Sequence, residues 1–147
     1  LIGRVDPLIL ESIAQYGIDD FFIHIPFTPH SEVLHLLTSA QILLLPIDDF
    51  DGAKWVLTGK LFEYMASRRP VLCIGPTDGD AAMLIKETGI GETFAFDDKE
   101  GLMNYLIKQH SLYLLKELKP NKNSNVSQYS RRELTRKLAM LLDEISL

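Results

Sequence analysis

Short apolar runs alternate along this chain with segments that have helical periodicity, and this alternation constrains the fold more than any other feature. Three runs of strand length, "QILLLPI", "RPVLCIG" and "GETFAF", follow one another between residues 41 and 96. Another aromatic and β-branched run lies near Phe21 to Ile25, and "LIG" at the start resembles the end of a strand. Such alternation is typical of a parallel sheet covered by helices on both faces. We therefore expect an α/β, Rossmann-like sheet of four strands, or five with "LIG".

The helical patterns fill the segments around these runs. They cover residues 7–17, a segment that begins near Ser31, and residues 58–67, 78–91, 98–118 and 128–145. Gly17 is placed as a C-cap, and Ser31 as an N-cap. Residues 119–127 are a polar loop. Ligands of such sheets bind beyond the carboxyl ends of the strands, so the loops "PFTPHS", "PIDDFDGAKWVLTGK" and "GPTDGD" are the ones to search for chemistry.

Composition excludes several classes of protein. The 147 residues suit a single domain, and 46% hydrophobic with 24% charged residues is typical of a folded globular chain. The net charge of −5 argues against binding to a nucleic-acid backbone. Cys73 is the single cysteine, which favours a cytosolic location, and no apolar run is long enough to cross a membrane. Because the chain begins at Leu1, we interpret it as a fragment of a longer protein.

The segment "TGKLFEYMAS" carries the strongest candidate site. A helical wheel places four apolar side chains on one side, where we expect burial: Leu61, Phe62, Met65 and Ala66. Lys60 and Glu63 fall on the opposite side. Lys60 lies in the first turn, where backbone N–H groups and the helix dipole favour an anion, and Thr58 can cap the helix or donate its hydroxyl. A carboxylate one turn further, Glu63, could accept both hydroxyls of a ribose; the alternative is an exposed Lys–Glu pair without function.

Other polar groups give weaker signals. Asp48, Asp49 and Asp51 could hold a divalent cation, although a solvated loop explains them more simply. The four histidines lack metal-ligand spacing, and we expect no metal site. The loop "GPTDGD" could approach a phosphate through its backbone, but it is neither a P-loop nor a G-x-G-x-x-G fingerprint. No G-x-S-x-G nucleophile motif is present.

Three blocks resemble the carboxy-terminal donor-binding domain of GT-B fold glycosyltransferases of the group 1 (family 4) type. They are "IPFTPHSEVLHLLTSAQILLLPI", "GKLFEYMASRRPVLCIG" and "DAAMLIKETGIG". The middle block carries the most specific pattern, and the resemblance extends over nearly the whole chain. It implies one nucleotide-sugar binding domain over residues 1–147, the C-terminal half of a GT-B fold lacking its first strand.

The resemblance also assigns roles to residues. It implies that Glu63 binds the ribose hydroxyls and that Thr58, Gly59 and Lys60 contact the diphosphate and the donor sugar. Lys60 and Glu63 are the residues that we expect to matter for catalysis. Phe27 and Thr28 correspond to a loop that meets the nucleobase. No cofactor or metal is implied, because the nucleoside-diphosphate sugar is a substrate.

One departure from the family pattern keeps alternatives open. Trp55 stands where family members often carry a second glutamate, eight positions before Glu63. The chain could therefore be an inactive nucleotide-sugar binding module, or part of a sugar-nucleotide epimerase. For the transferase, the expected partners are the nucleotide sugar and an amino-terminal acceptor domain of the same parent chain, with no nucleic acid. We expect the protein in the cytosol or at the inner face of a membrane, and we expect any contact with that membrane to be made only by regions missing from this chain. The fragment alone should not transfer sugar.

Overall fold

The computed structural model describes residues 1–122 and 124–145, and the chain divides into two compact units between residues 36 and 37. In the first unit, α1 (Pro7–Gln15) is capped by Asp6, whose side chain accepts a hydrogen bond of 2.9 Å from the Leu8 N–H. Proline at the first helical position has no N–H to leave unpaired, so it suits this helix start. Gly17 follows the helix at φ 63°, which confirms its predicted place beyond the helix end.

The strand predicted near Phe21 to Ile25 is wrong. A 3₁₀ turn, η1 (Asp19–Phe21), contains its first residue, and Ile25 makes only an isolated parallel bridge with Ile2. The bridge is held by hydrogen bonds of 2.9 Å from the Gly3 N–H to the Ile25 carbonyl and from the Ile25 N–H to the Leu1 carbonyl. The first unit leads into α2 (His30–Ser39), which begins one residue before the predicted cap.

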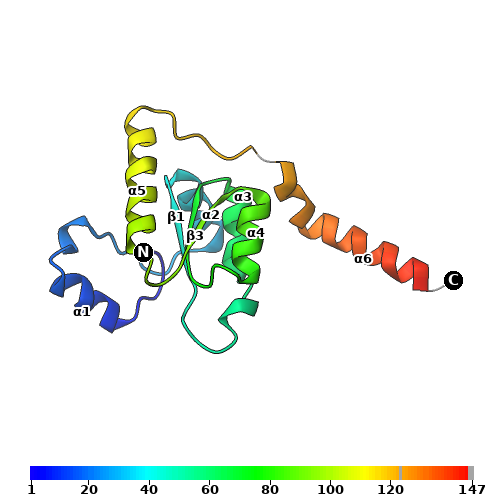
Figure 1. Ribbon diagram of the computed structural model, residues 1–147, viewed down its shortest axis with the longest axis horizontal. Coiled ribbons are helices and arrows are strands. Elements are labelled where there is room, and N and C mark those ends of the chain that lie inside the picture. The colour runs from blue at the N-terminus through cyan, green and yellow to red at the C-terminus, as the bar shows by residue number, and fades with distance from the viewer. Residues whose placement is uncertain (123, 146–147) are drawn as a thin grey trace. The chain divides into compact units, whose positions relative to one another are not determined.

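The second unit is built on a parallel sheet of three strands in the order β1 (Leu43–Pro46), β2 (Val71–Ile74) and β3 (Gly91–Phe94) (Figure 1). The α/β class and the parallel sheet are thus confirmed, with fewer strands among the described residues than the four or five expected. Pro46 lies on an edge strand, where its missing N–H costs no ladder hydrogen bond. Within β1, Leu44 is 49% exposed, whereas the central strand β2 is buried on both faces.

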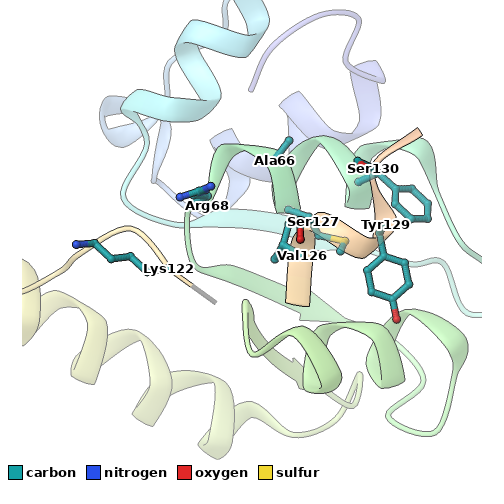
Figure 2. A pocket seen from close by; sticks show the side chains of 9 residues that line it. Ala66, Arg68, Lys122, Val126, Ser127, Tyr129 and Ser130 are labelled. Atoms are coloured by element: carbon teal, nitrogen blue, oxygen red, sulfur yellow. The ribbon is translucent and has the colours of Figure 1, made fainter. Parts of the chain in front are cut away.

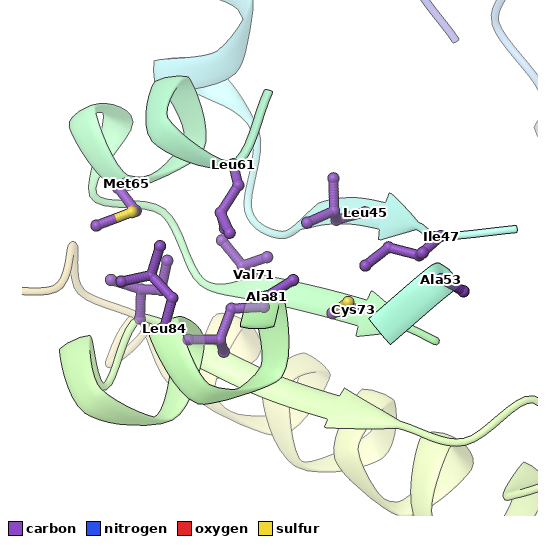
Figure 3. Close-up of a cluster of buried hydrophobic side chains, with 11 residues drawn as sticks. Leu45, Ile47, Ala53, Leu61, Met65, Val71, Cys73, Ala81 and Leu84 are labelled. Atoms are coloured by element: carbon purple, nitrogen blue, oxygen red, sulfur yellow. The ribbon is translucent and has the colours of Figure 1, made fainter. Parts of the chain in front are cut away.

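Helices α3 (Gly59–Ser67) and α4 (Asp80–Thr88) cover one face of this sheet, and α5 (Lys99–Leu114) covers the other. The larger core contains Leu45, Leu61, Met65, Cys73 and Ile85, all at most 1% exposed (Figure 3). On the opposite face the rings of Phe94 and Tyr105, a residue of α5, lie 5.5 Å apart between centroids. Leu61 and Met65 confirm the predicted buried side of α3; Ala66 is exposed, contrary to prediction, because it lies at the margin of that side.

Short elements complete the described chain. A 3₁₀ turn, η2 (Ala53–Trp55), interrupts the loop between β1 and α3, and another, η3 (Ser124–Tyr129), occupies part of the predicted polar loop. Residue 123 of that loop lies outside the described residues. The last helix is α6 (Arg131–Ile145), which has no buried residue. Among the described helices, none combines the length and the apolar character that crossing a bilayer requires.

Candidate functional site

The loops that leave the carboxyl ends of β1 and β2 carry the polar and charged groups that could bind a ligand. Residues 47–58 connect β1 to α3, and residues 75–79 connect β2 to α4. Because the strands are parallel, both loops emerge at the same edge of the sheet, and both end at a helix N-terminus. This edge is the usual ligand site of an open parallel sheet.

The N-terminus of α3 offers unsatisfied hydrogen-bonding groups. Thr58 is the N-cap residue, with extended backbone angles of φ −83° and ψ 148°. Its side chain makes no capping hydrogen bond, and its buried hydroxyl oxygen has no partner among the described residues. The N–H groups of a first helical turn lack intrahelical partners, although that of Leu61 donates to the Thr58 carbonyl at 3.1 Å. The start of α3 therefore presents donors to an anion.

Lys60 and Glu63 extend this site along α3. Lys60 is exposed in the first turn, and Glu63, three residues further, is half-buried. Residues three apart on a helix lie on the same side, so both face away from the buried Leu61 and Met65. Burial raises the pKa of the Tyr64 hydroxyl, and the negative charge of Glu63 raises it further. Gly59, Lys60 and Glu63 thus lie on the predicted helix, with Thr58 at its N-cap, and their role in binding stays a prediction.

The loops 47–58 and 75–79 contact each other through a hydrogen bond and through close packing at two glycines. Lys54 Nζ donates to Asp78 Oδ2 at 2.5 Å, and this hydrogen bond is the main cause that lowers the pKa of Asp78. A Cβ atom at Gly79 would lie 3.0 Å from the Lys54 carbonyl oxygen. One at Gly75 would lie 3.0 Å from Cβ of Ile47. The glycines of "GPTDGD", predicted as a possible phosphate contact, therefore have a structural reason: they let the two loops pack closely.

The acidic residues of the first loop do not form a recognisable metal centre. Asp48, Asp49 and Asp51 are exposed, and the described residues hold no group of three or more histidine, cysteine or acidic side chains suited to a metal ion. His24 makes a 2.7 Å hydrogen bond between Nε2 and the Gly3 carbonyl, a structural role within residues 1–36. His30 is exposed at the first position of α2.

Phe27 and Thr28 belong to residues 1–36. Phe27 is 90% exposed, and the Thr28 hydroxyl donates to the Pro26 carbonyl at 2.8 Å. Each unit is defined by its own contacts, so the predicted place of Phe27 and Thr28 beside a base bound at α3 stays a prediction.

An open pocket of about 480 Å³ lies along α3 and η3 (Figure 2). Its walls include Phe62, Met65 and Arg68 of the α3 segment, with Val126 and Tyr129 of η3. Arg68 follows the last residue of α3, so this pocket extends to the opposite end of the helix from Thr58 and Lys60. It was not predicted from the sequence, because η3 lies mostly in a segment whose composition indicated a loop.

The sequence reasoning also missed two features of the predicted edge. One is the Lys54–Asp78 pair, which joins positions 24 residues apart without any local signal. The other is the exposure of Trp55, a residue that is 76% accessible at the end of η2. Comparison of the chain with protein-family models, with curated proteins and with solved structures gave no match.

Proposed function

We propose that this chain binds a nucleoside-diphosphate sugar at the N-terminus of α3, as the donor-binding domain of a glycosyltransferase of the GT-B type. The observation that carries the proposal is the group Thr58, Lys60 and Glu63 at the carboxyl edge of a parallel sheet. Thr58 has a buried hydroxyl without a partner, and Lys60 adds a positive charge to the free N–H groups of the same turn. The sequence pattern "KLFEYMASRRPV" supports the same assignment.

In this proposal the diphosphate lies against the first turn of α3. The helix dipole and the Lys60 ammonium stabilise its charge, and the Thr58 hydroxyl, which is buried in the described structure, would donate to it after its side chain rotates outward. Glu63, one turn further, accepts the two ribose hydroxyls. During transfer the bond between the sugar and the diphosphate breaks, and negative charge grows on the departing diphosphate. The same donors then stabilise the leaving group more strongly than the substrate, which is how they would accelerate the reaction.

The sugar would pass to an acceptor held by an amino-terminal domain of the same parent protein, in polysaccharide or glycoconjugate synthesis. The proposal includes neither a cofactor nor a metal, since Lys60 and the helix N-terminus supply the positive charge that the diphosphate needs. It places the parent in the cytosol or at the inner face of a membrane, with any membrane contact made by other regions.

A second candidate is a module that binds a nucleotide sugar without transferring it. Trp55 favours it, because an indole cannot accept hydrogen bonds from sugar hydroxyls as the family glutamate can. An epimerase acting on the same nucleotide sugar would use the same donor site. All three share the nucleotide contacts of α3, and an acceptor-dependent transfer assay of the parent protein separates them.

Titration calorimetry of the protein with nucleoside diphosphates, for wild type and Glu63→Gln, tests the shared claim. A hydrogen bond to a charged group contributes on the order of 1.5–3 kcal/mol, so the variant should bind at least about tenfold more weakly. Glu100→Gln is the matched control, because Glu100 is an exposed glutamate in the first turn of α5. Both variants should melt close to wild type. Equal affinities for wild type and Glu63→Gln would contradict the ribose contact and favour the alternative, in which Glu63 is an ion-pair partner without a role in binding.

A further inference from the structure

Trp55 presents a large apolar surface on a backbone that is held firmly in place. Its side chain is 76% exposed, and Phe50 in the same loop is 53% exposed. Apolar residues exposed singly are common on protein surfaces, so a role for Trp55 depends on its place in the loop that leads to α3. The described residues include one aromatic pair, Phe94 with Tyr105, so Trp55 is not stacked on another ring of the described chain.

Four contacts anchor the turn that carries Trp55. Ala53, at the start of η2, is 5% exposed and belongs to the larger core. The Lys54 carbonyl packs against Gly79, and the Lys54 side chain pairs with Asp78. The Trp55 N–H donates to the Gly52 carbonyl at 3.0 Å, with Gly52 at φ 97°, a left-handed value that favours glycine. The indole is therefore displayed from a fixed backbone, which lowers the entropy lost when it binds a ligand.

The position of Trp55 relates it to the proposed diphosphate site. Two residues, Val56 and Leu57, lie between it and Thr58, so the two Cα atoms can lie at most about 11 Å apart. In a nucleoside-diphosphate sugar the sugar ring is bonded directly to the terminal phosphate. A ring attached to a diphosphate at the start of α3 therefore falls within reach of the indole.

The composition of the loop suits a sugar. One face of a pyranose carries mainly C–H groups and can stack on an indole, while its hydroxyls need hydrogen-bond acceptors at the edge. The same loop supplies three exposed carboxylates, Asp48, Asp49 and Asp51, within seven residues of Trp55. Binding sites of small molecules commonly combine an aromatic surface with a few polar groups in this way.

We infer that Trp55 is the stacking platform for the sugar ring of the nucleotide sugar and that it contributes to the choice of sugar. This inference rests on the proposed function, since it places the diphosphate at α3. Trp55 acts in it as a binding and specificity residue, not as a group that takes part in bond breaking.

The protein contains one tryptophan, so its fluorescence reports directly on Trp55. The probes are UDP, GDP and ADP alone, and UDP-glucose, UDP-galactose, UDP-N-acetylglucosamine, GDP-mannose and ADP-glucose, with excitation at a wavelength where the bases do not absorb. We expect one sugar nucleotide to shift the emission to shorter wavelength as the indole loses water, with a much smaller change for the matching diphosphate.

Affinities of variants complete the test. Wild type should bind the sugar nucleotide at least about fivefold more tightly than the diphosphate, the gain expected for one stacked ring. Trp55→Ala should lose this gain and keep its affinity for the diphosphate, and Trp55→Phe should retain part of it. Tyr113→Ala, which removes an exposed aromatic ring from α5, should behave as wild type.

The outcomes separate the two proposals. If diphosphate and sugar nucleotide change the emission equally, or if Trp55→Ala keeps the full sugar-dependent gain, the role of Trp55 is wrong and the diphosphate site stands. If neither class of ligand binds, both proposals are wrong.

Discussion

Replacing Gly91 by alanine should separate β3 from β2. Gly91 pairs with Val71 in the parallel ladder, and a Cβ atom at Gly91 would lie 1.8 Å from the Val71 carbonyl oxygen. Real Cβ atoms essentially never approach another atom closer than 3.0 Å, and the obstacle here is backbone, so the strands must move apart by more than 1 Å. The hydrogen bonds from the Val71 N–H to the Ile90 carbonyl and from the Gly75 N–H to the Phe94 carbonyl, both 2.9 Å, would then lengthen beyond bonding distance.

The expected cost follows from these losses. Breaking each of the two hydrogen bonds costs about 1–3 kcal/mol, because it leaves a buried group without a partner. The free energy of unfolding should therefore fall by about 2–6 kcal/mol, a large part of the stability of an ordinary domain. Urea denaturation followed by far-ultraviolet circular dichroism measures this change.

Gly59→Ala is the matched control for Gly91→Ala. A Cβ atom at Gly59 would meet nothing within 4 Å, and alanine favours a helix, so stability should stay unchanged or rise by up to about 1 kcal/mol. A Gly91→Ala protein with the urea midpoint of wild type would refute the observed register of β2 and β3.

Three further predictions concern the core and the acidic loop. Cys73 is fully buried, and burial raises the pKa of its thiol, although the Thr93 hydroxyl lowers it by a smaller amount. Ellman's reagent should therefore label Cys73 only in denaturant. Rapid labelling of the folded protein would contradict its burial. Burial and, to a smaller extent, the charge of Glu92 raise the pKa of Tyr105 from 10.0 to about 12. The tyrosine therefore ionises at a lower pH in the unfolded protein than in the folded protein. The free energy of unfolding should fall as pH rises from 10 to about 12. Tyr105→Phe should reduce this alkaline loss by on the order of 2 kcal/mol, and identical pH profiles for the two proteins would contradict the shift. Nucleotide affinity should be the same in EDTA and in Mg²⁺, and Asp51→Ala should leave it unchanged; an Mg²⁺ requirement that disappears with Asp51 would identify a metal site.

The elements of the second unit could be predicted because their signals are local. The apolar runs at β1, β2 and β3 and the glycine at the end of α4 mark their own boundaries. The burial of each strand was less accessible to prediction. The run "QILLLPI" indicated a strand buried on both faces, yet β1 is an edge strand with Leu44 half exposed, since burial depends on neighbours that lie far away in the sequence.

The failed strand near Phe21 shows the same limit. Aromatic and β-branched residues favour a strand only where a partner supplies hydrogen bonds, and in the described structure Ile25 has a single bridge to Ile2. The role of η3 could not be predicted either, because it spans the end of the predicted polar loop and the start of the predicted last helix, and one side chain from each, Val126 and Tyr129, packs on the core. At the candidate site, the helical spacing predicted Thr58, Lys60 and Glu63 together, whereas the Lys54–Asp78 pair depends on the meeting of two loops.

The central claim is that the start of α3 holds a diphosphate. Titration calorimetry of the protein with UDP, GDP and ADP, each beside its monophosphate and all in EDTA, tests this claim most directly. We predict saturable one-to-one binding of one diphosphate, weaker binding of its monophosphate, and a several-fold loss of diphosphate affinity in Lys60→Gln, with no loss in Lys86→Gln, which changes an exposed lysine of α4. Absence of saturable binding by all three diphosphates, or equal affinity for diphosphate and monophosphate, would contradict it.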